Sequence, residues 1–325
     1  MNKIRLLLIL GGSSSERTVS LKTGNQVYKA IDKNKYSVDL VDGATESQLK
    51  KIPGNKPYPP YDKFILNCRE KPELVFIALH GKHGEDGEVQ SFLDKQKIRY
   101  TFSGAKTSKD SMDKEITKFI YNKYGLPTAP DVIINKDDFL DYKMIIKKLG
   151  LPLVCKPANE GSSYGVSIVK NINQLGTAIT KAFKYDKKII VEKYIDGREI
   201  TVAILGNNHP EALPPIEIIP KNRDFFDFKA KYEIGASEEI CPAKIPKEIT
   251  LRSQKIAIKA HKVLGCRGLS RSDFIFDRDL KIYILETNTI PGMTPTSLLP
   301  KAAAAAGYSF EDLIQKILDL AMEKY

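Results

Sequence analysis

RSDFIFDRDLKIYILETNTIPGMT, residues 271–294, is the stretch around which the chain is organised. Its two apolar runs, 274–276 and 282–285, flank the polar segment 277–279. Short apolar runs joined by a polar turn are typical of paired strands. The stretch therefore predicts a β-hairpin with its strand ends held side by side.

Polar side chains lie at the ends of the two predicted strands. Pairing the strands places Asp273 near Glu286 and Asn288. Carboxylate and amide oxygens, with no His or Cys nearby, suit magnesium or manganese and are poor ligands for zinc. Arg271 points to the same face as Asp273, where its guanidinium can bind a phosphate or a developing oxyanion. The alternative is an ordinary surface hairpin with scattered acids, because short motifs give false matches.

Length and composition indicate a globular protein of two or three domains. The chain has 325 residues, of which 42% are hydrophobic and 28% charged. The net charge of +11 favours an anionic partner, such as nucleic acid or a phosphorylated metabolite. The lysines are spread along the chain, however, without interleaved aromatic residues. We therefore expect a solvated basic surface and no nucleic-acid partner.

The cysteines and the N-terminus bear on the cellular compartment. Cys68, Cys155, Cys241 and Cys266 show no CxxC spacing, so we expect reduced, mostly buried thiols in a cytoplasmic protein. The apolar run 4–10 is too short for a signal peptide, and no run has the length of a membrane helix.

The N-terminal third is predicted to be a parallel α/β unit. The run 4–10 ends in a glycine and serine loop, and a helical period follows over 19–31. This order aims the helix N-terminus at a ligand beyond the strand end. The buried run 74–79 leads into HGKHGEDG, residues 80–87, a loop suited to a ligand. We place this domain at residues 1–104.

The remaining chain is divided into residues 105–195 and 196–325. In the first part, 108–124 has the pattern of one helix. A hairpin with the small, flexible tip 161–165 follows, and Lys156 precedes that tip. Backbone N–H groups and an ammonium can together replace the solvation of a triphosphate, although no GxxxxGK[ST] loop is present.

The last part contains a long loop and a clear helix. Residues 223–233 are polar and aromatic and show neither the helical nor the strand periodicity of apolar residues. We therefore expect a mobile loop in which Lys231 and Tyr232 are candidate ligand contacts. Residues 249–264 have the pattern of a helix ending at a glycine.

Several of these residues have ordinary explanations when taken singly. Glu16 near a helix start is favoured by the helix dipole, and His80 can be a turn residue. Lys114 and Lys156 can be solvated. Each, however, falls at a strand end or in a loop of a chain that also carries the oxygen-ligand hairpin, which favours a common site.

The ordered motifs resemble those of D-alanine–D-alanine ligases, which belong to the ATP-grasp superfamily. The resemblance runs from about residue 6 to residue 322. The residues that carry it are Gly11-Gly12 with Ser14 and Glu16, His80-Gly81 with 84–87, Ser111 to Lys114, Lys156-Pro157 with 160–163, Lys231-Tyr232, Arg271 with Asp273, Glu286 with Asn288, and 291–294.

The resemblance implies a three-domain ATP-grasp fold, α/β and α+β, with an N-terminal parallel-sheet domain. It also implies ATP-dependent formation of D-alanyl-D-alanine for peptidoglycan precursors. One D-alanine carboxylate attacks the γ-phosphate to give an acyl phosphate, which the amine of a second D-alanine then attacks. Magnesium or manganese, with two ions expected, and a homodimer are further implications. A related ligase with D-serine or D-lactate as second substrate is the alternative.

The resemblance also assigns roles by position. Glu16, His80, Ser297 and Leu298 would bind the amino-acid substrates. Arg271 and the N–H of Gly292 would stabilise the oxyanion, and Ser162 and Tyr232 would close the loop. For ATP, the assigned residues are Lys114, Lys156 and Lys231 at the triphosphate, Glu192 with backbone groups of Lys193 and Ile195 at the adenine, and Glu199 at the ribose. The metal ligands are Asp273, Glu286 and Asn288.

Two details qualify the resemblance. Tyr232 stands where relatives that make D-alanyl-D-lactate usually have Phe, so the dipeptide is the expected product. Arg17 replaces a frequent His, and neither this change nor the variant segment 289–290 removes a proposed ligand.

Overall fold

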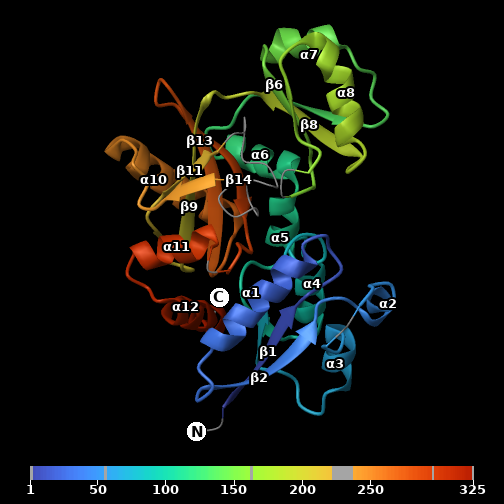
Figure 1. The fold of residues 1–325 in the computed structure, drawn as a ribbon, viewed down its shortest axis with the longest axis vertical. Helices are drawn as coiled ribbons and strands as arrows, with labels where there is room; N and C mark the ends of the chain where they lie inside the picture. Colours follow the sequence, from blue (N-terminus) through green and yellow to red (C-terminus); the bar gives the residue numbers. More distant parts are fainter. Residues whose placement is uncertain (1–2, 55–56, 162–163, 222–236, 295, 324–325) are drawn as a thin grey trace.

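The computed structural model describes residues 3–54, 57–161, 164–221, 237–294 and 296–323. Three sheets follow one another along the longest axis of the molecule (Figure 1). The mixed α/β fold with an N-terminal parallel sheet agrees with the predicted class. In the described part of the chain, no helix is both long and apolar enough to cross a bilayer.

The first sheet is parallel and has the strand order β2-β1-β3-β4. Helix α1 packs on β1 so closely that a Cβ on Gly24 would lie 2.5 Å from Leu10 Cβ. This close contact aims the start of α1 at the carboxyl end of the sheet. The elements are β1 (Ile4–Leu10), α1 (Arg17–Ala30), β2 (Tyr36–Asp42), α2 (Glu46–Leu49), α3 (Tyr61–Asn67), β3 (Leu74–Ile77), α4 (Glu88–Lys95) and β4 (Arg99–Tyr100).

A helix pair leads away from the first sheet. The single helix predicted over 108–124 is wrong, since α5 (Ala105–Met112) ends and α6 (Lys114–Lys123) begins at Asp113. Asp113 is extended, and its carboxylate accepts hydrogen bonds from Glu115 N and Ile116 N. An acid in this position starts a new helix because it satisfies N–H groups that otherwise lack partners.

The second sheet in chain order is antiparallel, with the strand order β5-β8-β6-β7. Helices α7 and α8 cover one of its faces (Figure 1) and pack on a small core of their own. The elements are β5 (Asp131–Asn135), α7 (Tyr142–Leu149), β6 (Leu153–Pro157), β7 (Ser167–Val169), α8 (Ile172–Ala182) and β8 (Lys188–Lys193).

The third sheet carries the predicted hairpin. Its strand order is β12-β11-β9-β13-β14, with β10 paired to β9. Helix α10 packs on it together with Tyr121 of α6 and Leu126 from the segment after α6. The elements are β9 (Gly197–Leu205), β10 (Glu211–Ala212), β11 (Ile216–Pro220), β12 (Ser237–Ile240), α10 (Lys247–Leu264), β13 (Leu269–Asp277), β14 (Ile282–Asn288), α11 (Leu298–Ala305) and α12 (Phe310–Met322).

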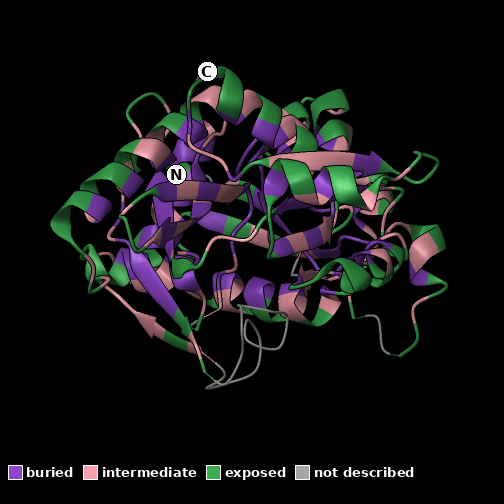
Figure 2. Ribbon diagram, turned by 90° about the horizontal axis from the view of Figure 1, so that it is seen from above, coloured by how far each residue is buried: buried purple, intermediate pink, exposed green. Residues whose placement is uncertain are grey.

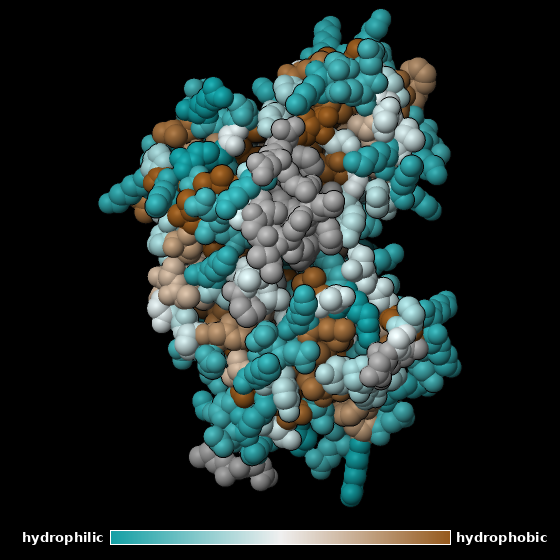
Figure 3. Space-filling model, in the orientation of Figure 1, coloured by the Kyte–Doolittle hydropathy of each residue, from teal (hydrophilic) through white to brown (hydrophobic). Residues whose placement is uncertain are grey.

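Buried residues follow the strands and the inner faces of the helices, while the outer faces of the helices are exposed (Figure 2). Hydrophilic residues cover most of the surface shown in Figure 3, with only scattered apolar patches, as the spread of lysines predicts. The expectation of mostly buried thiols is wrong: Cys155 is buried, but Cys68, Cys241 and Cys266 are partly exposed. All of these thiols are free.

Candidate active site

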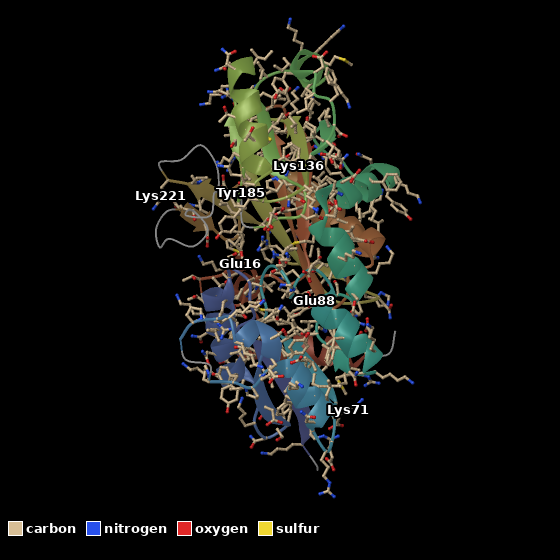
Figure 4. All side chains as sticks on the ribbon, turned by 90° about the vertical axis from the view of Figure 1, so that its right-hand side faces the viewer. Glu16, Lys71, Glu88, Lys136, Tyr185 and Lys221 are labelled. Carbon is tan, nitrogen blue, oxygen red and sulfur yellow. The ribbon has the colours of Figure 1, made fainter. Side chains whose placement is uncertain are left out.

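A cavity of about 470 Å³ lies where the N-terminal unit meets the third sheet. Figure 4 shows Glu16 at this junction. The predicted site residues that line the cavity are Glu16, His80, Lys114, Arg271, Glu286, Asn288, Gly292, Ser297 and Leu298. Residues more than 280 positions apart in the chain are thus brought to one cavity.

One wall is formed by the start of α1 and the loop after β3. Glu16 occupies the N-cap position of α1 and is only 8% exposed. Ser14 connects the two segments, because its Oγ donates to His80 O at 2.7 Å and accepts from Glu16 N at 3.2 Å. On the imidazole, His80 Nε2 lies 2.9 Å from Thr23 Oγ1. Ser14 therefore joins the backbones of Glu16 and His80, while Thr23 of α1 contacts the His80 ring.

A second acid of this wall, Glu85, was missed by the sequence prediction. Its Oε1 lies 3.5 Å from His80 Nδ1. Burial raises the pKa of Glu85; the hydrogen bond to His80 opposes the rise, and the charge of Glu16 adds to it. Buried acids around a small cavity provide a negative potential for an ammonium group.

The opposite wall is the hairpin, and its predicted pairing is confirmed. Asp273 pairs with Glu286, and Arg271 pairs with Asn288. An irregularity in the register follows Asp273, and such bulges re-aim side chains near functional sites. On the buried face, Thr287 Oγ1 accepts from Tyr121 Oη at 2.7 Å and lies 2.7 Å from Ser272 Oγ.

Arg271 and Asp273 form a bidentate ion pair in this structure. Arg271 Nε donates to Asp273 Oδ1 at 2.9 Å, and Nη2 donates to Oδ2 at 2.8 Å. Thr201 Oγ1 adds a hydrogen bond to Oδ1 at 2.6 Å. The arginine thus already balances the charge of the carboxylate. Asp273 lies in the middle of β13 and not at the strand end that the sequence predicted, because the strand begins at Leu269.

The oxygens at the hairpin end suit a hard divalent cation. Asp273 and Glu286 face each other across the strands, and Asn288 adds an amide oxygen that accepts from Ile290 N at 2.8 Å. Lys114 Nζ lies 3.6 Å from Glu286 Oε2. This donor set has the oxygen chemistry of magnesium and manganese sites that bridge phosphates.

The chain after the hairpin closes the cavity at the start of α11. Ser297 is the N-cap of α11, and its Oγ accepts from Thr294 N at 3.0 Å. A Cβ on Gly292 would lie 2.8 Å from Ser297 Oγ, so a larger residue here would require the serine side chain to shift. The N–H of Leu298 begins the helix, and a helix start of this kind favours a carboxylate.

Three of the predicted nucleotide residues lie on the second sheet, Lys156 on β6 and Glu192 and Lys193 on β8. Lys156 Nζ lies 2.5 Å from Glu192 Oε1. Burial alone would raise the pKa of Glu192, but Lys156 and Lys118 outweigh it and lower the pKa to about 2. For Lys156, burial alone would lower the pKa, but the attraction of Glu192 outweighs it and raises the pKa above its ordinary value.

Other predicted nucleotide contacts extend from this ion pair. Lys114 Nζ donates to Glu160 O at 2.8 Å, which joins α6 to the hairpin tip of the second sheet. Lys193 is exposed at the end of β8, and its N–H donates to Pro130 O at 2.9 Å. Ile195 lies between β8 and β9, and Glu199 lies on β9.

Three predicted site residues cannot be placed. Arg17, which the sequence did not assign to the site, forms a bidentate pair with Asp42. Ser162, Lys231 and Tyr232 lie outside the described residues, as does the predicted loop 223–233.

Sequence reasoning also missed Ser111 and Lys118. Ser111 lines the cavity, and its buried Oγ has no hydrogen-bond partner among the described residues. A polar side chain buried in a helix leaves no distinct pattern in one sequence. The motif at 111–114 was the available signal for Ser111.

The comparisons with known proteins agree with the geometry. The family described as D-ala D-ala ligase C-terminus matches residues 120–319. A D-alanine–D-alanine ligase of Syntrophobacter fumaroxidans is 45% identical over 99% of this chain and 98% of its own length. The chain belongs to the D-alanine–D-alanine ligase family. The predicted resemblance is therefore confirmed.

Other members of the D-alanine–D-alanine ligase family match over their full lengths. The ligase of Desulfotalea psychrophila is 44% identical over 99% of this chain and 96% of its own. The crystal structure of the ligase from Bacillus anthracis superimposes with a TM-score of 0.82 at 34% identity, covering 98% and 97% of the two chains. The ATP-grasp fold predicted from sequence is that of these ligases.

Proposed function

We propose that the chain joins two D-alanines into D-alanyl-D-alanine while ATP is converted to ADP and phosphate. The observation that carries this proposal is the cavity with acids on one wall and the Arg271 hairpin with the α11 start on the other. A zwitterionic amino acid needs both an anionic and a cationic surface. The product is a precursor for peptidoglycan.

In the first step, Glu16 binds the ammonium of the first D-alanine and His80 lies beside it. The carboxylate of this D-alanine attacks the γ-phosphorus of ATP, and the bond to ADP breaks. A free carboxylate is a poor electrophile, so the acyl phosphate supplies the leaving group for the next bond.

In the second step, the amine of the second D-alanine attacks the acyl carbon and loses a proton, and phosphate leaves. Ser297 and the N–H of Leu298 hold the carboxylate of this second substrate. Arg271 and the N–H of Gly292 stabilise the tetrahedral oxyanion, where preorganised donors are most effective.

The proposal assigns the nucleotide to the second sheet and the metal to the hairpin. The nucleotide residues are Lys114, Lys156 and Lys231 at the triphosphate, Glu192 with backbone groups of Lys193 and Ile195 at adenine, and Glu199 at ribose. Asp273, Glu286 and Asn288 would hold Mg²⁺ or Mn²⁺, with two ions expected; when bound, the ions offset phosphate charge. Ser162 and Tyr232 are proposed to close the loop 223–233 over the site and exclude water.

The arrangement of the whole protein is proposed on the same basis. Residues 1–104, 105–195 and 196–325 are the proposed domains, and a homodimer follows from the family resemblance alone. A cytoplasmic location suits free thiols. Light scattering during gel filtration tests the dimer, which a monomeric mass would refute.

Phosphate release tests the activity directly. We expect turnover to require D-alanine, ATP and a divalent cation together, and a lack of stimulation by D-alanine would refute the proposal. Glu286→Gln and Arg271→Met are expected to lower kcat by about 10²-fold or more. Their circular dichroism should stay native, and retained activity in both variants would show that the site is elsewhere.

D-Serine or D-lactate as the second substrate is not favoured, since the relatives carry the name D-alanine–D-alanine ligase over their full lengths. Competition between D-alanine and each alternative across pH, read by mass spectrometry of the products, measures the selectivity. D-Alanyl-D-alanine should dominate.

A further inference from the structure

We propose that Lys118 is a positioning residue of the nucleotide site, where it holds Glu192 in place so that Lys156 can turn to the triphosphate. This inference rests on the proposed function, because that function assigns Glu192 to adenine and Lys156 to phosphate. Lys118 itself touches neither substrate in this scheme and acts through Glu192.

The buried face of α6 carries the first part of the argument. Lys118 is only 5% exposed, although lysine is almost never fully buried unless paired. Tyr121 lies one turn further along the same face and donates to Thr287 on β14, between the proposed metal ligands Glu286 and Asn288. Helix α6 is thus fixed to the metal hairpin while Lys118 reaches the second sheet.

Lys118 is held there by three acceptors. Its Nζ donates to Ala129 O at 2.7 Å and forms ion pairs with Asp131 Oδ1 and Glu192 Oε2, each at 3.0 Å. Asp131 and Glu192 are register partners on β5 and β8. The ammonium therefore separates two acids that would otherwise repel each other across neighbouring strands.

The two oxygens of Glu192 have different partners. Oε2 binds Lys118, and Oε1 binds Lys156 at 2.5 Å. If Lys156 moves to a phosphate, Glu192 keeps one buried counter-charge and Oε1 can accept from the base amino group. Without Lys118, Lys156 would be the remaining cation for Glu192 and would be held back from the triphosphate, since an unpaired buried charge is costly.

The test compares Lys118→Met with Lys118→Arg. We expect Met to raise both the KM for ATP and the calorimetric Kd for ADP by about tenfold or more, while the KM for D-alanine changes less than about twofold. Arg restores the charge and should recover most of the ATP affinity. An unchanged ADP Kd and KM for ATP in a folded Lys118→Met would overturn the inference.

Lys188→Met is the matched control. Lys188 on β8 binds Asp113 Oδ2 and Glu115 Oε2, each at 2.6 Å, at the start of α6. It therefore joins the same strand to the same helix without touching Glu192. An effect on the KM for ATP below about twofold is expected. An effect equal to that of Lys118→Met would show that Lys118 only fastens the helix, which overturns the proposal.

A double-mutant cycle tests the route through Glu192. Lys118→Met added to Glu192→Gln should change the ATP:GTP preference no further than Glu192→Gln alone, because coupled residues are not additive. Additive losses would contradict action through Glu192. If Lys118→Met does not fold, the Kd for ADP of Lys118→Arg is measured instead. A tenfold higher Kd despite the retained charge would overturn the proposal, and a near-native Kd would support it.

The unmodified enzyme separates the two proposals. A parent protein that binds ADP but shows no D-alanine-dependent turnover refutes the proposed function. A parent protein that turns over normally, with Lys118→Met unaffected, refutes the role of Lys118 alone.

Discussion

Two largely buried glutamates on different walls of the site have pKa values shifted in opposite directions. Glu192 is paired with two lysines, and its pKa is lowered to about 2. For Glu85, burial raises the pKa and Glu16 adds repulsion, and this rise outweighs the opposing hydrogen bonds from His80 and the Gly81 backbone. The residue type is the same, so the partners decide the sign. At the proposed nucleotide site, Glu192 is neutralised by ion pairs with lysines. At the proposed amino-acid site, Glu85 and Glu16 lie close enough for their charges to repel each other.

Glu192→Gln should have the largest effect on stability, because it removes the carboxylate that pairs with Lys118 and Lys156. It leaves Lys118 with Asp131 as its paired acid, and Lys156 as a buried cation near the charges of Glu286 and Asp131. We expect a loss of about 3–5 kcal/mol in the free energy of unfolding, measured by urea titration. Glu85→Gln is the matched control, and a similar loss in both variants would contradict the comparison.

His261 extends the comparison to a buried base without an acid. Its Nδ1 lies 2.8 Å from Ser270 Oγ, and burial lowers its pKa to about 4. Unfolded His titrates near 6.5, so the unfolded state binds more protons between the two values. Stability should therefore fall by about 3 kcal/mol as pH drops from 6.5 to 4.

Replacing His261 with Gln tests this effect. The variant should lose most of the slope of unfolding free energy over that pH range, even if its stability at pH 7 is lower. Urea titrations at half-unit pH steps measure the slope. Equal slopes in both proteins would assign the effect to other groups.

Glu85→Gln should have a smaller effect, mainly on substrate binding. A folded-state pKa above the unfolded value means that ionised Glu85 opposes folding at neutral pH and that this cost disappears as pH falls through the folded pKa. Stability should therefore stay within about 1 kcal/mol or increase. The KM for D-alanine should rise about fivefold at pH 7 from the lost negative potential, and its pH dependence should flatten. An unchanged KM would show that Glu85 does not contribute to the negative potential at the D-alanine site.

Thr23→Val should have the smallest effect. It removes the hydroxyl 2.9 Å from His80 Nε2 and preserves the shape of the side chain. We expect the KM for D-alanine to rise about two- to fivefold with little change in kcat. Thr23→Ser retains the hydroxyl and should behave like the parent protein. If Thr23→Ser raises the KM for D-alanine as much as Thr23→Val does, the effect comes from lost packing and not from the lost hydrogen bond.

The hairpin could be predicted because alternating polar and apolar runs specify strand pairing locally. Its register places Asp273 opposite Glu286, as the two apolar runs indicate. The cavity position of Glu16 and His80 followed from a general property of parallel sheets, whose strand ends gather ligand groups.

What the sequence did not reveal depends on contacts between distant segments. Lys118 has the appearance of an ordinary helix-surface lysine until Asp131 and Glu192 are placed around it. The spacing of Lys114, Lys118 and Tyr121 on one helix face was a faint signal for a polar interface. The break at Asp113 was also present as an N-cap residue, but the continuous helical period on both sides concealed it.

Helix α12 supplies part of the core of the first sheet. Leu313, Ile314, Ile317 and Leu318 belong to the same buried cluster as β1 and β3. Helix α12 contacts β3 and β4, and Gln315 Nε2 donates to Tyr36 Oη at 3.1 Å. During translation, the N-terminal sheet therefore emerges from the ribosome long before the helix that completes its packing. The strands of the first sheet must therefore wait for a segment made more than 200 residues later, and these two distant parts of the chain complete their folding together.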